Sequence, residues 1–135
     1  MSKRPSLPII KRMDHITKRL ITLALKEDLG LKGDLTSKAI LGNKEAKAVL
    51  KLKTEAVLFG QDVFKEVFRL VDKRVSVSFL YKDGSFLTGP CLVAELKGNA
   101  SSLLKAERTA LNFLCFLSGI ATQTRRYVEE ARKYG

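Results

Sequence analysis

The segment AERTALNFLCFLSGIAT, residues 106–122, has the pattern of a helix that is apolar around most of its circumference. Leucine, phenylalanine and alanine recur at spacings of three and four residues, and a helix that is apolar on all sides is normally surrounded by protein. Its middle nevertheless carries Glu107, Arg108 and Asn112. We therefore expect this helix to lie in the interior and to hold these polar side chains for a specific reason.

The charged pair Glu107 and Arg108 allows two interpretations. On a helical wheel Glu107 lies in line with Leu103, and Arg108 lies beside Leu104, so neither charge is expected to reach water easily. In the structural interpretation the charges pair with neighbours, Asn112 bonds Arg108, and the group fixes the register of the helix. In the functional interpretation Arg108 binds an anion at the rim of a pocket, oriented by Glu107 and Asn112. Arginine suits this role because its planar guanidinium meets a carboxylate or phosphate with two parallel hydrogen bonds.

The composition is that of one domain with a real core. The chain has 135 residues, of which 45% are apolar, and its formal net charge is +11. Such a charge attracts polyanions, which include nucleic acid, anionic lipid and phosphorylated small molecules. No run approaches the roughly 20 apolar residues of a membrane span, and the first residues lack an apolar stretch of signal length. These features predict a cytoplasmic protein.

The two cysteines, Cys91 and Cys115, stand in apolar surroundings and are not spaced as a metal-binding pair. We expect both to be reduced thiols in the core of a cytosolic protein, with no disulfide.

The remaining pattern predicts an α+β domain. Helix, strands, helix, strands and a long final helix indicate a mostly antiparallel sheet covered on one side by helices. The stretch 27–40 is rich in glycine and aspartate and is predicted to be an ordered loop, and Ser118-Gly119 are predicted to bend or restart the last helix. Periodicity predicts helices at 14–30, 61–71 and over the last 35 residues, and strands at 46–53, with 56–60 as an extension, 75–81 and 91–98. The apolar stripes expected to face inward are Ile16, Leu20, Leu23 and Ala24 on the first helix and Val63, Phe64, Val67, Phe68 and Val71 on the second.

Two segments together resemble a known family. LLKAERTALNFLCFLSGIATQTRRYV, residues 103–128, resembles the signature helix of the quinolinate phosphoribosyltransferases, also called carboxylating nicotinate-nucleotide pyrophosphorylases. KEDLGLKGDLTS, residues 26–37, resembles that family's second N-terminal signature, and the two occur in the family's order. The resemblance extends from about Ile16 to Gly135.

The resemblance implies a specific activity. The family joins quinolinate to phosphoribosyl pyrophosphate and forms nicotinate mononucleotide, pyrophosphate and carbon dioxide in NAD biosynthesis, with Mg accompanying the pyrophosphate. Its N-terminal part is an open α/β sandwich and its C-terminal part is an α/β barrel. In the homodimer, or a higher homo-oligomer, the arginine of the ER-x-ALN motif contacts quinolinate in the neighbouring subunit's site. That position is Arg108 in this sequence.

The resemblance also implies a division of the chain. We expect an N-terminal tail at 1–13, the sandwich domain at 14–117, and a helical connection at 118–135 that leads toward the barrel. A barrel needs about 200 residues, so we expect it to be absent from this chain, which would then hold no catalytic residue, no metal site and no activity of its own. The roles of Arg125 and Arg126 stay open; placing basic residues near a helix C-terminus is also what the helix dipole favours.

Two alternatives remain open. A paralogous phosphoribosyltransferase of the same fold, either the molybdenum-transport-associated relative or a nicotinate-specific enzyme, could keep both signatures. A small basic module that binds nucleic acid would explain the charge and the lysine face of strand 46–53. Against that second alternative, the sequence has no helix-turn-helix, no zinc-ligand spacing and no aromatic stacking motif.

Overall fold

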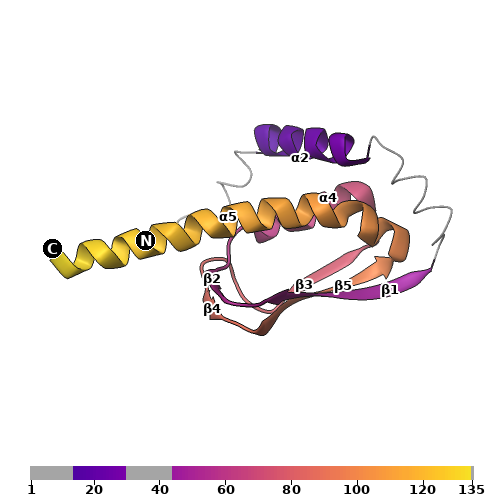
Figure 1. Cartoon of the computed structure of the whole chain (residues 1–135). Coiled ribbons are helices and arrows are strands. Elements are labelled where there is room, and N and C mark those ends of the chain that lie inside the picture. The colour runs from indigo at the N-terminus through magenta and orange to yellow at the C-terminus, as the bar shows by residue number, and fades with distance from the viewer. Residues whose placement is uncertain (1–13, 30–43, 135) are drawn as a thin grey trace, which may run out of the picture.

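The longest element of the protein is the helix α5, Ala100–Tyr134, and the other elements pack along it (Figure 1). The structure, a computed structural model, describes residues 14–29 and 44–134. The predicted tail at 1–13 and most of the predicted loop at 27–40 lie outside these residues. In chain order the elements are α2 (Asp14–Leu29), β1 (Glu45–Leu52), β2 (Glu55–Val57), α4 (Gln61–Val71), β3 (Ser76–Phe79), β4 (Phe86–Thr88), β5 (Cys91–Asn99) and α5.

The described residues form three layers (Figure 1). The strands form the first layer, α4 and α5 cover one face of it, and α2 packs on α4 and α5 from the other side. In the main sheet the strand order is β1-β5-β3, and both pairs are antiparallel. The predicted α+β sandwich with an antiparallel sheet is therefore confirmed.

The strand β2 was expected to extend β1, and this expectation is wrong. β2 instead pairs with β4 in a separate two-stranded antiparallel sheet. The break falls between Leu52 and Glu55, where the chain leaves the edge of the main sheet and turns toward α5. Three consecutive polar residues, Lys53, Thr54 and Glu55, interrupt the alternation at this break. Periodicity does not show which strand β2 pairs with, because that partner lies about 30 residues later in the sequence.

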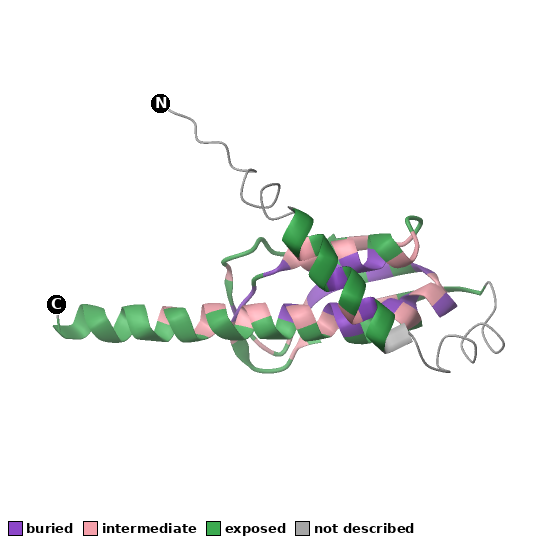
Figure 2. Ribbon diagram, turned by 90° about the horizontal axis from the view of Figure 1, so that it is seen from above, coloured by how far each residue is buried: buried purple, intermediate pink, exposed green. Residues whose placement is uncertain are grey.

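The core lies between the helices and the sheet. On α4 the apolar stripe of the sequence points inward as predicted, and Phe64, Val67 and Phe68 are buried. The ring of Phe64 packs at 5.1 Å from the ring of Phe68 and at 5.4 Å, edge to face, from that of Phe79. The opposite face of the sheet is solvated, because Lys47, Lys51, Glu95 and Lys97 alternate with the inward-facing residues. The burial pattern is shown in Figure 2.

Two expectations about the helices are corrected. The helix α5 runs without interruption through Ser118-Gly119, so the predicted restart is wrong. On α2 the residues that bury are Ile21 and Leu25, whereas Ile16, Leu20 and Leu23 point to solvent. Neither α2 nor any other helix of the described residues has a stretch long and apolar enough to cross a membrane.

Burial on α5 is confined to its first half and to one side. Its buried residues end at Leu114, and the second half projects beyond the sandwich (Figure 2). Other large apolar residues of α5 are exposed: Leu104 is 50% exposed, Phe116 66% and Ile120 50%. The expected core position of Cys115 is wrong as well, since this thiol is exposed, while Cys91 is half-buried. The residues that the structure describes cover one side of α5 and leave apolar residues on its other sides exposed.

The carboxylate of Asp72 joins the end of α4 to the start of α5. It accepts hydrogen bonds from the hydroxyl of Ser102 at 2.7 Å, and from the backbone N–H and the Nε of Arg74, both at 3.0 Å. Its backbone N–H also closes the last turn of α4 by donating to the carbonyl of Phe68. The bonds from Arg74 and Ser102 lower the pKa of Asp72 from 3.8 to about 2.

We predict that Asp72→Ala lowers the free energy of unfolding by about 2 kcal/mol, because it removes several hydrogen bonds to a charged group. The lowered pKa means that the ionised carboxylate stabilises the fold above pH 3.8 and that this contribution disappears as the pH falls from 3.8 toward 2. Urea unfolding at several pH values measures both effects. Asp72→Asn, which keeps one acceptor but cannot ionise, should lose less stability and show a weaker acid dependence. Identical acid dependence in Asp72→Asn and the original protein would contradict this account.

Candidate functional site

Arg108 lies on the outward side of α5. It is exposed, and the residues that precede and follow it by two positions, Ala106 and Ala110, are fully buried on the inward side. Among the residues that the structure describes, none forms a hydrogen bond or an ion pair with its guanidinium. All five donors of this group are therefore free to meet a partner that approaches the outward side.

The neighbours of Arg108 on this side include both apolar and polar residues. Residues four and seven positions apart share a helix face, so Leu104, Asn112 and Cys115 flank Arg108, and all three are exposed. Phe116 and Ile120 extend the apolar surface toward the C-terminus of the helix. A permanent cation within an exposed apolar surface is typical of a contact face, because apolar surface is normally covered and arginine is enriched where proteins meet.

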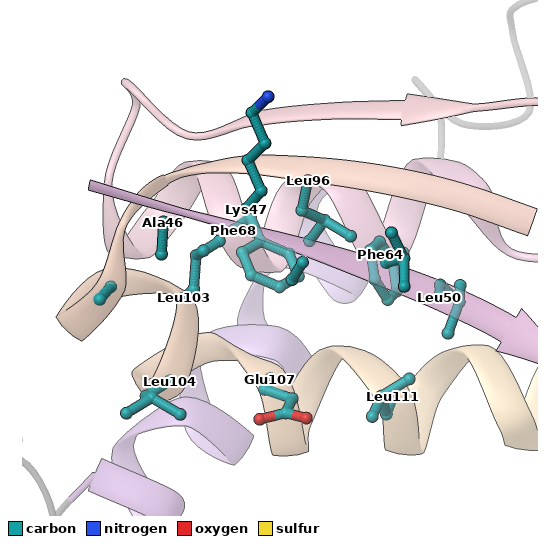
Figure 3. Close-up of a pocket in the computed structure, with 13 residues that line it drawn as sticks. Ala46, Lys47, Leu50, Phe64, Phe68, Leu96, Leu103, Leu104, Glu107 and Leu111 are labelled. Carbon is teal, nitrogen blue, oxygen red and sulfur yellow. The ribbon is translucent and has the colours of Figure 1, made fainter. Parts of the chain in front are cut away.

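Glu107 points in a different direction from Arg108 and lines an apolar cavity of about 330 Å3 between α5 and β1 (Figure 3). In the close-up its carboxylate lies between Leu104 and Leu111, and the ammonium of Lys47 points away from the cavity. The lining residues are Ala46, Lys47, Ala48, Val49, Leu50, Phe64, Phe68, Leu96, Ala100, Leu103, Leu104, Glu107 and Leu111.

The cavity is unsuited to an anion. A second apolar cavity of about 110 Å3 adjoins it along α5, and both are lined by Leu50 and Leu111. Their walls are apolar side chains, and the one carboxylate at the rim, that of Glu107, would repel a negative charge. An anion is therefore expected on the outward side, near Arg108, and not in this cavity.

The structure does not bring the three predicted polar residues together. Glu107, Arg108 and Asn112 are all exposed, and within the described part of the chain neither Glu107 nor Asn112 is bonded to Arg108. The expectation that both charges are kept from water is wrong for this chain alone. The helical wheel shows which residues neighbour each other on the helix. It does not show whether other parts of the protein cover them, and Leu104 and Cys115 beside Arg108 are exposed.

Sequence reasoning missed a polar contact made by the second half of α5. The hydroxyl of Ser118 accepts a hydrogen bond from the backbone N–H of Phe59 at 3.0 Å, and the hydroxyl of Thr122 accepts one from the N–H of Val57 at 2.9 Å. The signal in the sequence was the spacing of four between two hydroxyl residues in an otherwise apolar run. Three residues further on, the guanidinium of Arg125 stacks on the ring of Phe86 at 3.7 Å.

No cluster of three or more histidine, cysteine, aspartate or glutamate side chains that could hold a metal ion occurs within residues 14–29 and 44–134. The exposed guanidinium of Arg108 offers recognition of negative charge, and the exposed Leu104 beside it offers apolar contact. The net charge of +11 adds a long-range attraction of the same sign.

Comparison with known proteins agrees with this geometry. Residues 34–118 match the family model described as the N-terminal domain of quinolinate phosphoribosyl transferase. The chain belongs to the quinolinate phosphoribosyltransferase family. The matched segment contains Arg108 and ends at Ser118, within α5. The predicted membership of this family is therefore confirmed.

Relatives from distant bacteria share this quinolinate phosphoribosyltransferase domain. The chain is 41% identical over 117 residues to a protein of Bacillus subtilis named "probable nicotinate-nucleotide pyrophosphorylase (carboxylating)" and spans 40% of that protein's length. The nicotinate-nucleotide pyrophosphorylase structure from Francisella tularensis superposes with a TM-score of 0.79 at 35% identity. The superposed part comprises 94% of this chain and 42% of the Francisella tularensis chain. NadC from Streptococcus pyogenes gives a TM-score of 0.77 at 41% identity, and the superposed part comprises 89% of this chain and 42% of the NadC chain.

We predict that Glu107→Leu leaves the free energy of unfolding of this domain unchanged or raises it by up to about 1 kcal/mol, because a leucine buries additional apolar surface at the cavity rim. Thermal or urea unfolding measures the change. Glu130→Leu on the solvated end of α5 is the control and should stay within about 0.5 kcal/mol. A loss of about 3 kcal/mol in Glu107→Leu alone would instead show a buried ion pair that the substitution breaks.

Proposed function

We propose that this chain is the N-terminal domain of a quinolinate phosphoribosyltransferase, which converts quinolinate and phosphoribosyl pyrophosphate to nicotinate mononucleotide, pyrophosphate and carbon dioxide in NAD biosynthesis. The observation that carries this proposal is the family match over residues 34–118, which includes an exposed arginine without a partner among the described residues. In the complete enzyme, magnesium would enter with the pyrophosphate of the second substrate.

In this proposal Arg108 binds a carboxylate of quinolinate. A guanidinium can hold a carboxylate through two parallel hydrogen bonds, and these fix the direction of the pyridine ring as well as its position. The ring nitrogen, which attacks the sugar, is then aimed at the anomeric carbon. Arg108 thus has a positioning role and transfers no proton.

A fixed positive charge also suits the later decarboxylation. The substrate carries two carboxylates, and a guanidinium that stays charged can hold one of them while the other leaves as carbon dioxide. Such a charge is most effective in a site that excludes water. Arg108 is exposed in this chain, so a second protein surface must cover it before it can act in this way.

We propose that the covering surface belongs to a second copy of the protein, so that Arg108 completes the site of the neighbouring subunit. The apolar residues around Arg108 support this arrangement, because Leu104, Phe116 and Ile120 are each at least half exposed. Uncovered side chains of this size favour association. In a symmetric homodimer each interface residue occurs once in each subunit, so every apolar residue of the face is buried twice per dimer.

We predict that Arg108→Ala lowers kcat/KM for quinolinate by roughly 30-fold or more, since loss of a bidentate charged contact costs on the order of 2 kcal/mol in transition-state binding. The assay is formation of nicotinate mononucleotide by the domain joined to the C-terminal part of the Bacillus subtilis relative. Arg126→Ala, which removes an exposed arginine further along the same helix, is the control and should retain full activity.

The same assay separates the alternatives. Full activity of Arg108→Ala would show that Arg108 does not bind quinolinate, although the proposed activity of the protein would stand. Turnover of nicotinate in place of quinolinate by the unaltered protein would indicate the nicotinate-specific paralogue. Absence of turnover with either substrate, together with tight salt-sensitive binding to DNA, would favour the nucleic-acid module.

A further inference from the structure

We propose that Ser118 and Thr122 are positioning residues that hold α5 at one rotation and one axial position against β2, and thereby place Arg108. The part of the proposal that concerns Arg108 rests on the proposed function. The part that concerns the helix rests on the hydrogen bonds of the described residues alone.

One edge of the strand β2 is not covered by another strand of residues 14–29 and 44–134. At its other edge β2 pairs with β4, and Leu58 continues this pairing through its N–H to Ser85 and its carbonyl to the N–H of Gly84. Because successive residues of an extended chain point in opposite directions, the N–H groups of Val57 and Phe59 point away from β4. They face α5.

Ser118 and Thr122 satisfy these two groups. The hydroxyl of Ser118 accepts from the N–H of Phe59 and donates to the carbonyl of the same residue, both at 3.0 Å. The hydroxyl of Thr122 accepts from the N–H of Val57 and donates to the carbonyl of Ser118, one turn earlier in α5. The helix therefore supplies the acceptors that a third strand would supply.

The spacing of the two hydroxyls fits the strand. Two residues of a strand span about 6.6 Å, and four residues of a helix rise about 6 Å and return to nearly the same side. Ser118 and Thr122 are four apart, and Val57 and Phe59 are two apart. Both bonds can form only at one axial position, because a shift by one helical residue moves each hydroxyl by about 100° around the axis.

Close packing at Gly60 reinforces this position. A β-carbon at Gly60 would lie 2.8 Å from the side chain of Leu117, so α5 touches the backbone of this segment directly. Beyond Leu114 no residue of α5 is buried, and the bonds of Ser118 and Thr122, with the stacking of Arg125 on Phe86, are the directional contacts of this part of the helix.

The consequence for Arg108 follows from the stiffness of the helix. Apolar contacts such as those of Leu103 and Leu114 tolerate repacking, whereas hydrogen bonds depend on direction. A rotation of α5 by about 20° would move a side chain about 6 Å from the axis by about 2 Å. Errors of about 1 Å in the placement of a substrate-binding group are enough to reduce turnover strongly.

The test uses Thr122→Val, Ser118→Ala and the matched control Thr124→Val in the complete protein. Thr124 resembles Thr122 in donating to the carbonyl four residues earlier, that of Ile120, but it accepts no bond from β2. Thr122→Ser keeps the hydroxyl and is the rescue variant. Hydrogen exchange at the amides of Val57 and Phe59 reports on the helix contact, and the KM for each substrate reports on Arg108.

We expect Thr122→Val to speed exchange at the amide of Val57 at least tenfold, and Ser118→Ala to do the same at Phe59. Each variant should raise the KM for quinolinate at least fivefold and leave the KM for phosphoribosyl pyrophosphate within twofold. Thr124→Val should match the unaltered protein in all readouts, and Thr122→Ser should restore them.

Unchanged exchange in Thr122→Val would overturn the helix contact. Faster exchange with an unchanged KM for quinolinate would overturn the link to Arg108. If the unaltered protein forms no nicotinate mononucleotide, the proposed function fails together with that link, and amide exchange alone then decides whether the two hydroxyls hold the helix.

Discussion

Packing against the inner side of α5 is the interaction on which the other elements depend. The helices α2 and α4 and the strands β1, β2 and β5 all contact it. The first half of α5 makes these contacts with apolar residues, from Leu103 to Leu114. The second half makes them with hydroxyls and a stacked guanidinium. One helix thus organises both the core and the edge of the smaller sheet.

The sequence predicted those features that depend on local periodicity. The inward stripe of α4 and the alternation of β1 were recovered, because each element buries one face against this chain and solvates the other. The α+β class followed from the order of the elements. These predictions needed no knowledge of which segments far apart in the sequence come together.

Other features depended on contacts that periodicity does not contain. The separation of β2 from β1 arises from pairing with β4 some 30 residues later. Arg108 and Cys115 are exposed because they lie on a side of α5 that the described residues do not cover. The bonds of Ser118 and Thr122 were not predicted, since hydroxyls in a helix usually bond the preceding turn. Here Thr122 does this and also accepts a bond from the open edge of β2, whereas Ser118 bonds that edge in both directions.

The open side of α5 is central to the proposed function, because it carries Arg108 and its coverage by a second copy would complete a site. Cys115 lies on this side, seven residues from Arg108, and is exposed in the single chain. The most direct measurement is the rate of Cys115 alkylation in the complete protein across a range of concentrations, with the half-buried Cys91 as reference. The account predicts slow modification of Cys115 in concentrated protein and fast modification on dilution. A fast rate at every concentration, equal to that of an uncovered thiol, would contradict coverage by a second copy.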